Sequence, residues 1–200
     1  MGLLSIIRKV KEKEREIRLL LLGLDNAGKS TVLKQFLGKS SEEISSISPT
    51  LGFDIKSKDF NGFMLNIWDV GGQTSIRAFW RNYFEETDGL VFVIDASDRE
   101  RILECREELM KVLKQEKLVG ASVLILANKQ DIKGALNTEE IELILGMKQV
   151  EGSEERGDLM FKNRHAKVFA CSAVEKGNEG LLKGFEWIVQ DVGRRMYRLV

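Results

Sequence analysis

The sequence predicts an α/β fold in which a mostly parallel six-stranded sheet, with one antiparallel hairpin at its edge, carries helices on both faces. Short apolar runs alternate with segments whose apolar residues recur at helical spacing, which is typical of this class. The pair Asn61-Gly62 separates two strand-like segments and is a strong hairpin signal. The length of 200 residues suits one domain, expected at 16–200, with an amphipathic helix before it at 1–15.

Each expected strand is a short apolar run, and each expected helix carries an apolar face. In the segment 99–115, for example, Ile102, Cys105, Leu109 and Val112 share one helical face. The strands are expected at residues 17–23, 53–60, 63–69, 90–95, 122–127 and 167–171. The helices are expected at residues 29–37, 99–115, 138–145 (capped by Asn137 or Thr138) and 180–196. The acidic segment 151–158 is expected to form a surface loop, and His165 is assigned to this loop region without a role.

Composition and charge argue against several classes of protein. Lys+Arg and Asp+Glu balance at 31 each, so nothing indicates the cationic surface that nucleic-acid binding needs. The two cysteines, Cys105 and Cys171, do not suggest a disulfide framework, and a reducing, cytoplasmic location fits them best. The apolar run at 19–22 is far shorter than the roughly 20 residues that span a bilayer. We therefore expect a soluble monomer.

The segment Gly23-Leu24-Asp25-Asn26-Ala27-Gly28-Lys29-Ser30 matches the phosphate-binding pattern G-x-x-x-x-G-K-[ST]. It stands between an expected strand and an expected helix, as this pattern requires. Glycines let the backbone wrap a polyphosphate, and the helix N-terminus points its N–H groups at the anion. Lys29 is expected to reach the terminal phosphates, and Ser30 to bind Mg²⁺. The predicted phosphate-site residues are Gly23, Asp25, Asn26, Ala27, Gly28, Lys29, Ser30 and Thr31.

Four further residues are candidates for the same site. Asp69 ends an apolar strand and is expected to hold Mg²⁺ through water. Thr50 could bind Mg²⁺ and sense the γ-phosphate, although spacing alone favours a capping or turn threonine. In the segment after Asp69, Gly72 could offer its N–H to the γ-phosphate, and Gln73 could orient an attacking water. The alternative is a flexible glycine turn beside a solvated glutamine.

The segment Asn128-Lys129-Gln130-Asp131 follows another apolar run and predicts a guanine site. The Asp131 carboxylate can accept hydrogen bonds from N1–H and the 2-amino group of guanine, a pattern that adenine does not offer. Asn128 is expected to bond the base edge and tie adjacent loops, and the Lys129 stem to pack on the base. Cys171-Ser172-Ala173 follows the last strand, where Ser172 and Ala173 complete the site and Ala173 could offer its N–H to guanine O6. An Asn/Asp-capped turn is the alternative.

These motifs, in this order, resemble the small-GTPase superfamily. Within it, four segments resemble the Arf and Arf-like branch: Pro49-Thr50-Leu51-Gly52-Phe53, Trp68-Asp69-Val70-Gly71-Gly72-Gln73, Phe79-Trp80-Arg81-Asn82-Tyr83-Phe84 and Asn128-Lys129-Gln130-Asp131. The opening six residues and the stretch 65–72 are most similar to the Arf-like-two subgroup, with Arf-like-three as its neighbour. The chain departs from the family at Asp54, where the family usually has Asn, and in the longer segment 151–165.

The resemblance implies a P-loop GTPase fold and a switch that cycles between GDP and GTP, with Mg²⁺ and slow hydrolysis. In that mechanism Lys29 and Mg²⁺ stabilise developing charge, Thr50 and Gly72 order two loops, and Gln73 positions water. No internal arginine finger is apparent, so an activating protein is expected to complete the site, and an exchange protein to reload it. A GTP-dependent scaffold with little turnover is the alternative. An ATP-using P-loop kinase is a third hypothesis, against which Asp131 argues.

The resemblance also implies partners. The subgroup is linked to tubulin folding through tubulin-folding cofactor D and to microtubules, and it binds the prenyl-binding delta protein and the binder of Arf-like two. A microtubule, centrosome or basal-body location follows from this resemblance. Phe53, Trp68 and Tyr83, here called the aromatic trio, correspond to an exposed patch that Arf-like proteins present to effectors. The alternative is that these three aromatics are core residues.

The first residues form an apolar stripe, at Leu3, Ile6, Ile7 and Val10, beside a basic face. Serine stands at position five rather than six, so no myristoylation is expected. Residues 3–10 could lie on a membrane as a peripheral contact, insert into a partner or pack on the domain.

Overall fold

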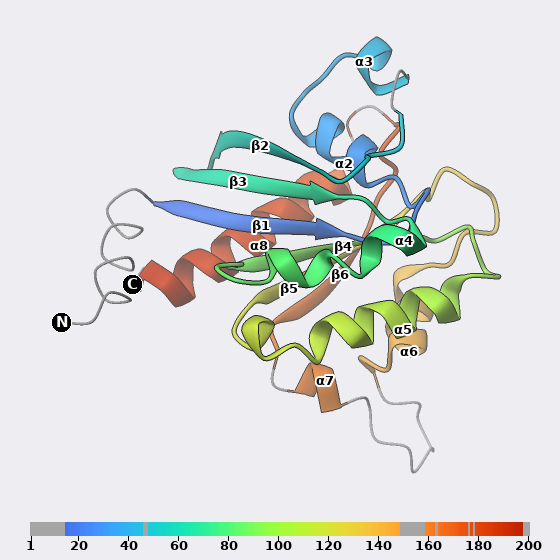
Figure 1. Ribbon diagram of the computed structural model, residues 1–200. Helices are drawn as coiled ribbons and strands as arrows, with labels where there is room; N and C mark the ends of the chain where they lie inside the picture. Colours follow the sequence, from blue (N-terminus) through green and yellow to red (C-terminus); the bar gives the residue numbers. More distant parts are fainter. Residues whose placement is uncertain are drawn as a thin grey trace.

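The computed structural model describes residues 15–45, 48–148, 159–162, 164–175, 177 and 179–197. Its strands form one six-stranded sheet in the order β2-β3-β1-β4-β5-β6 (Figure 1). The strands are β1 (Glu16–Leu22), β2 (Phe53–Phe60), β3 (Phe63–Val70), β4 (Gly89–Asp95), β5 (Ser122–Asn128) and β6 (Ala166–Ala170). The helices are α2 (Lys29–Phe36), α3 (Ser41–Ser45), α4 (Thr74–Arg77), η1 (Trp80–Tyr83), α5 (Ile102–Leu113), η2 (Glu116–Leu118), α6 (Thr138–Leu145), α7 (Leu159–Lys162) and α8 (Glu179–Tyr197).

The predicted fold class is confirmed. The strands β1, β3, β4, β5 and β6 pair in parallel, and β2 pairs antiparallel with β3 at the edge of the sheet. Asn61 and Gly62 turn this hairpin with positive φ values of 51° and 79°, which is why the pair suits a tight turn. The paired residues run from Phe60 opposite Phe63 to Phe53 opposite Val70. The hairpin therefore ends beside the segment that carries Gly72 and Gln73.

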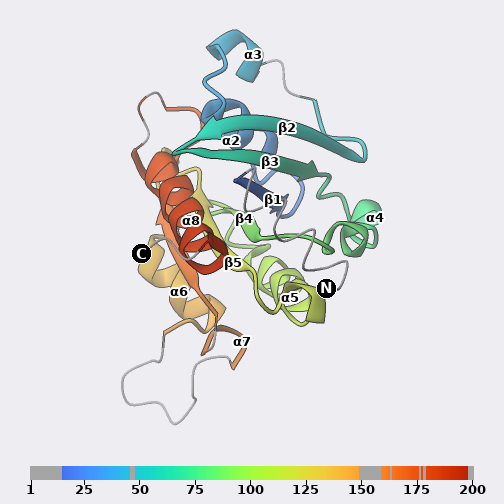
Figure 2. The same ribbon diagram turned by 90° about the vertical axis from the view of Figure 1, so that its left-hand side faces the viewer.

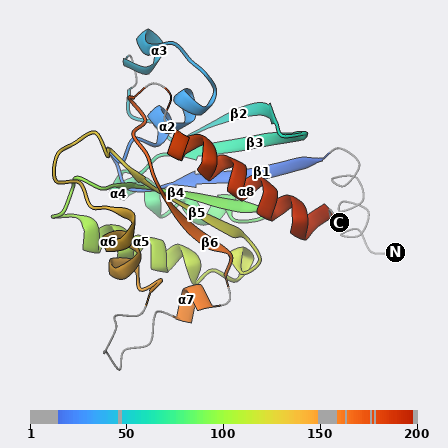
Figure 3. The same cartoon turned by 180° about the vertical axis from the view of Figure 1, so that it is seen from behind.

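Helices cover both faces of the sheet (Figures 1 and 3). Successive residues of β1 supply opposite faces: Leu20 packs in the core cluster beneath α5 and α6, and Leu21 in the cluster beneath α2 and α8. This alternation follows from the two-residue repeat of a strand. Figure 2 shows the resulting three layers, with α8 on one side of the sheet and α4 and α5 on the other. None of the described helices is long and apolar enough to cross a membrane.

The strand order places a ligand site at one edge of the sheet. Neighbouring parallel strands β3, β1, β4 and β5 run in the same direction, so their carboxyl ends meet there. Strand β1 lies between β3 and β4: the connection after β1 leads to one side of it, and the connection after β3 crosses to β4 on the other side. Ligands of open α/β sheets bind at such a switch point. The segments that follow these four strands carry the motifs singled out in the sequence.

The structure differs from the predicted elements mainly at short helices and boundaries. The helix expected at 99–115 is shorter, since α5 spans Ile102–Leu113. The brief helices α3, α4, η1, η2 and α7 were not predicted, because three to five residues are too few to show a helical repeat. His165 does have a partner: its Nδ1 lies 2.8 Å from Asp191 Oδ1 on α8. Nearly all of the helix expected at 1–15, and the loop at 151–158, lie outside the described residues.

Candidate nucleotide-binding site

The phosphate loop follows β1 and leads directly into α2. Gly23 has a φ of 146°, and a Cβ there would lie 2.2 Å from the Val93 carbonyl oxygen. Gly28 precedes the helix with a φ of 89°, and a Cβ there would lie 2.4 Å from the Asn128 amide nitrogen. Both glycines of the motif are therefore required by the close approach of β4 and β5 as well as by backbone conformation. The loop is built as the motif predicts.

Lys29 is buried inside this loop, with 7 % of the residue exposed. Its ammonium group donates to the carbonyl oxygens of Gly23 at 3.0 Å and Leu24 at 2.8 Å. Burial lowers the pKa of Lys29 to about 8, while Asp69 and Asp25 act in the opposite direction. A lysine held this way presents its charge at the floor of the site, where a polyphosphate would stabilise the charged form.

Ser30, Thr50 and Asp69 converge from three separate segments. The Ser30 hydroxyl donates to Asp69 Oδ2 at 2.5 Å and lies 2.9 Å from Thr50 Oγ1, which in turn lies 3.5 Å from Asp69 Oδ2. Burial raises the pKa of Asp69, against the lowering effects of Ser30 and Lys29. Asp69 Oδ1 is buried and has no hydrogen-bond partner among the described residues. Spacing along the sequence alone favoured a capping or turn role for Thr50, whereas the structure places its hydroxyl beside Ser30.

This cluster fits Mg²⁺, the cation that accompanies GTP and GDP in such sites. Mg²⁺ prefers hard oxygen ligands and keeps several waters. Ser30 and Thr50 supply two hydroxyl oxygens, and the unpartnered Asp69 Oδ1 can accept a hydrogen bond from a metal-bound water. When bound there, Mg²⁺ would neutralise charge on the terminal phosphates. The predicted ligand roles of these three residues are thus compatible with the geometry.

The segment after β3 packs tightly on the phosphate loop. A Cβ at Gly72 would lie 2.4 Å from the Gly23 carbonyl oxygen and 2.5 Å from Lys29 Nζ. The Gly71 carbonyl accepts from the buried Trp80 indole at 2.9 Å. Gln73 is the N-cap residue of α4 and faces the same cavity. Gly72 therefore brings its backbone next to the lysine, which is the position predicted for a γ-phosphate contact.

A cavity of about 490 Å³ joins these parts into one site. It is large enough for a small-molecule ligand. Most of the residues that the sequence assigns to the phosphates line it, together with four that it did not assign: Ile44, Ser48, Pro49 and Gly71. The lining residues are Asp25, Asn26, Gly28, Lys29, Ser30, Thr31, Ile44, Ser48, Pro49, Thr50, Gly71, Gly72 and Gln73.

The base motif at the end of β5 is joined to the phosphate loop. Asn128 is 2 % exposed, and its amide nitrogen donates to the Ala27 carbonyl oxygen at 2.9 Å. Its amide oxygen accepts from the backbone N–H of Ala173 at 3.0 Å. Asn128 thus ties three segments, as predicted. The Ala173 N–H is already engaged here, so its predicted contact with guanine O6 requires that this donor be shared or released.

Asp131 and Lys129 are each held by a partner. The buried Ser172 hydroxyl donates to Asp131 Oδ1 at 2.6 Å, so Ser172 orients the carboxylate predicted to select guanine. The Lys129 ammonium pairs with Asp95 Oδ2 at 2.6 Å. Asp95 was not among the predicted site residues. It ends β4 much as Asp69 lies near the end of β3, and that shared position is a signal that could have identified it.

The aromatic trio forms a cluster on β2, β3 and η1. Ring centroids lie 5.6 Å apart for Phe53 and Trp68, 5.3 Å for Phe53 and Tyr83, and 5.7 Å for Trp68 and Tyr83. Phe53 is 49 % exposed, whereas Trp68 and Tyr83 are half-buried and pack against the core. The Arg18 guanidinium lies 4.1 Å from the Trp68 ring centroid. The trio is therefore partly core and partly surface.

A family model described as "Arf: ADP-ribosylation factor family" matches residues 3–192. The chain is 53 % identical to ADP-ribosylation factor-like protein 2 of Arabidopsis thaliana and 48 % identical to the protein of that name in Drosophila melanogaster, over 100 % of each chain. It is 47 % identical to ADP-ribosylation factor-like protein 3 of Chlamydomonas reinhardtii, covering 96 % of this chain and 99 % of the relative. Among solved structures it resembles the Arl6 (BBS3) small GTPase of Trypanosoma brucei, solved with the nucleotide analogue GppNp. That match has a TM-score of 0.76 and 26 % identity, covering 90 % of this chain and 98 % of the other.

Proposed function

Because this chain belongs to the Arf family of GTP-binding, GTP-hydrolysing switch proteins, we propose that its GTP form acts in tubulin folding, microtubule function and the trafficking of lipidated cargo. Two features support the proposal. Relatives named ADP-ribosylation factor-like protein 2, from three organisms, match over their full length. The subgroup resemblance of the sequence implies the same pathway. The partners proposed for the GTP form are tubulin-folding cofactor D, the prenyl-binding delta protein and the binder of Arf-like two.

The position of the aromatic trio is the observation that carries the proposal. Phe53 follows Thr50 by three residues, and Trp68 directly precedes Asp69. Just beyond the last residue pair of β2 and β3, the Gly71 N–H donates to the Gly52 carbonyl oxygen at 2.9 Å. The two segments that approach the phosphate site are therefore continuous with the strands that carry Phe53 and Trp68. A γ-phosphate that orders Thr50 and Gly72 would stabilise this surface for a partner.

The proposed roles in hydrolysis follow from the same geometry. Gln73 orients the attacking water, Lys29 stabilises charge on the terminal phosphates, and Gly72 contributes its N–H. Intrinsic turnover is slow because Gln73 alone assembles the water. An activating protein completes the site and accelerates hydrolysis by roughly 10³–10⁵-fold, and an exchange protein restores the GTP form.

The test is calorimetric titration of purified tubulin-folding cofactor D and prenyl-binding delta protein with two forms of this protein. GTP-loaded Gln73→Leu should bind, and GDP-loaded wild type should bind at least about tenfold more weakly. Phe53→Ala in the GTP-loaded form should cost about 2 kcal/mol, the size typical of an aromatic anchor. Leu103→Ala is the matched control, since Leu103 is 65 % exposed on α5, away from the trio.

Each outcome has a definite meaning. If the partners bind the GTP-loaded and GDP-loaded forms equally well, the result would support the scaffold alternative and contradict the switch proposal for these partners. No binding to either partner would reject the pathway while leaving membership of the Arf family intact.

We further propose a cytoplasmic monomer that associates with microtubules or with the centrosome or basal body. Residues 3–10, which lie outside the described part of the chain, would make at most a peripheral membrane contact. Vesicle flotation of the full chain and of a chain lacking residues 3–10 tests this contact. Flotation that does not depend on residues 3–10 would overturn it.

A further inference from the structure

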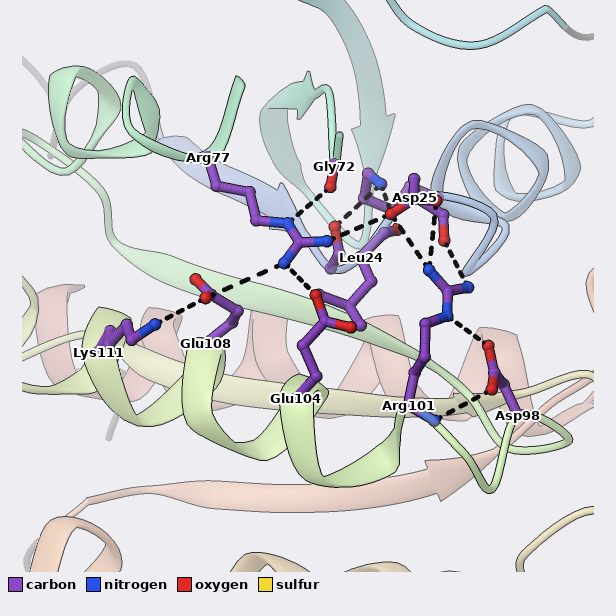
Figure 4. Close-up of polar contacts among 11 residues, drawn as sticks. Leu24, Asp25, Gly72, Arg77, Asp98, Arg101, Glu104, Glu108 and Lys111 are labelled. Atoms are coloured by element: carbon purple, nitrogen blue, oxygen red, sulfur yellow. Dashed lines mark hydrogen bonds and ion pairs between the residues drawn. The ribbon is translucent and has the colours of Figure 1, made fainter. Parts of the chain in front are cut away.

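Arg77, an arginine that the motifs do not include, joins two parts of the nucleotide site to helix α5 (Figure 4). Its Nε donates to the Gly72 carbonyl oxygen at 2.8 Å, its Nη1 to Glu104 on α5 at 2.6 Å, and its Nη2 to Asp25 of the phosphate loop at 3.2 Å. Glu108 lies 4.0 Å from Nη1. The Arg77 side chain is only 7 % exposed. The planar guanidinium thus links the segment after β3, the phosphate loop and α5.

The four-residue helix α4 is attached through the Arg77 side chain and through Ile76, which is partly buried and packs against the core. The helix has no fully buried residue of its own. Charge-assisted hydrogen bonds are roughly twice as strong as neutral ones. The Asp25 and Glu104 side chains are 43 % and 41 % exposed, so water screens both pairs in part. Since Arg77 is enclosed, its bonds hold the start of α4 against the phosphate loop and α5.

The Gly72 carbonyl oxygen accepts two hydrogen bonds. It accepts from the Asp25 backbone N–H at 3.2 Å as well as from Arg77 Nε. This carbonyl belongs to the planar peptide unit that connects Gly72 to Gln73. Fixing its direction therefore fixes where the Gln73 backbone begins and how Gly72 faces Lys29.

We propose that Arg77 is a positioning residue for GTP hydrolysis: it holds Gly72 and Gln73 in the arrangement that senses the γ-phosphate and aligns the attacking water. It does so from outside the phosphate cavity, paired with Asp25 and Glu104, and does not contact the reacting atoms. The inference rests on the GTPase activity of the family and is independent of the proposed tubulin and cargo partners. The Gly72 N–H predicted to meet the γ-phosphate belongs to the preceding peptide unit, which is joined through the Gly72 Cα to the unit that Arg77 holds.

Arg101 provides a matched control on the same carboxylate. Its Nη1 lies 3.2 Å from each of the two Asp25 carboxylate oxygens, and its Nε donates to Asp98 at 2.7 Å (Figure 4). Among the described residues, Arg101 makes no hydrogen bond to Gly72. Both arginines therefore neutralise Asp25, but Arg77 is the one that also holds the Gly72 carbonyl. Arg81, an exposed arginine on η1, serves as the surface control.

The experiment measures GDP affinity, affinity for the non-hydrolysable analogue GppNHp, and single-turnover GTP hydrolysis for Arg77→Ala, Arg101→Ala and Arg81→Ala. Arg77→Ala should keep GDP affinity within about threefold but lose at least about tenfold in both GppNHp affinity and hydrolysis, the loss expected for a charge-assisted bond. Arg101→Ala should affect GDP and GppNHp alike, because it acts through the phosphate loop. Arg81→Ala should match wild type.

Tryptophan fluorescence gives a readout that simple destabilisation would not move. The Trp80 indole donates to the Gly71 carbonyl, so the emission change on replacing GDP with GppNHp reports the same segment. This change should shrink in Arg77→Ala and persist in Arg101→Ala. If Arg77→Ala does not fold, Glu104→Gln, which removes its closest carboxylate partner, should show the same selective loss at about threefold.

Three results would overturn the proposal. Arg77→Ala could hydrolyse GTP and bind GppNHp as wild type does. It could lose GDP and GppNHp affinity equally, which would reduce Arg77 to a structural residue. Or Arg101→Ala could reproduce the selective loss, which would assign the effect to Asp25 rather than to Gly72.

Discussion

The Asn128 amide nitrogen donates to the Ala27 carbonyl oxygen at 2.9 Å, which joins the end of β5 to the phosphate loop across 101 positions of sequence. The other end of the same amide accepts from the Ala173 N–H at 3.0 Å. The predicted base site and phosphate site are thus one rigid unit. This bond also explains why Gly28 has no room for a side chain, since a Cβ there would meet the Asn128 amide.

Asn128→Ala should loosen both sites together. Burying the Ala27 carbonyl and the Ala173 N–H without partners should lower the free energy of unfolding by about 2–4 kcal/mol and speed nucleotide release at least about tenfold. Denaturant unfolding and release of fluorescent mant-GDP measure the two effects. Asn137→Ala is the control: it removes the α6 cap and should cost about 1 kcal/mol without changing release. Release as slow as wild type in Asn128→Ala would contradict the prediction.

Ser30→Ala should make nucleotide release insensitive to Mg²⁺. The variant removes a hydroxyl that lies between Thr50 and Asp69, in the cluster that fits the ion. In wild type, chelation by EDTA should accelerate mant-GDP release; in Ser30→Ala release should already be about 10–100-fold faster and EDTA should add little. Ser30→Thr, which restores the hydroxyl, should behave as wild type. An unchanged response of Ser30→Ala to EDTA would place the ion elsewhere.

Asp131→Asn should change the base preference of the site from guanine to xanthine. An amide at this position cannot accept both guanine donors, but it can donate to the 2-oxo group of xanthine. We expect at least about a hundredfold loss of GTP affinity and a gain for xanthosine triphosphate, measured by competition against mant-GTP. Ser172→Ala removes the hydroxyl that donates to Asp131 Oδ1 at 2.6 Å. This variant should lower the affinity for GTP only modestly and should bind no xanthine nucleotide. Asp131→Asn that still prefers guanine would remove Asp131 from the base site.

Nucleotide affinity should fall as the pH rises above about 8. Burial lowers the pKa of Lys29 to about 8 in the nucleotide-free protein, and a bound polyphosphate stabilises its charged form. Binding therefore takes up a proton above this pH, and affinity should weaken by up to about tenfold per pH unit. Calorimetry in buffers of different ionisation enthalpy measures the uptake. Lys29→Arg, which stays charged, should show none.

The lowered pKa of Lys29 also determines how the stability of the nucleotide-free protein depends on pH. Between pH 8 and Lys29's ordinary value of 10.5, the unfolded chain holds a proton that the folded chain has lost. The Lys29 contribution to the free energy of unfolding of the nucleotide-free protein should therefore rise with pH across this window. Denaturant titrations of wild type against Lys29→Arg isolate that contribution, and a difference that does not change with pH would contradict the assigned shift.

The sequence by itself determined the fold class, the phosphate loop and the base motif. These depend on local patterns: apolar runs of strand length, the Asn61-Gly62 turn, and glycines whose backbone conformations other residues rarely adopt. The strand at Phe53–Phe60 and the helix at Thr138–Leu145 were predicted to the residue for the same reason, and of the two cap candidates, Asn137 and Thr138, the structure shows Asn137.

Only the tertiary structure decided which distant residues meet. Thr50 and Asp69 are 19 positions apart, Asp25 and Arg77 are 52 apart, and Ser172 and Asp131 are 41 apart. No periodicity in the chain encodes such pairs, since they depend on the order of the strands and on the path of each loop across the sheet edge. The short helix α4 belongs to the same class: Arg77 fixes it through contacts with other segments, which a local pattern cannot contain.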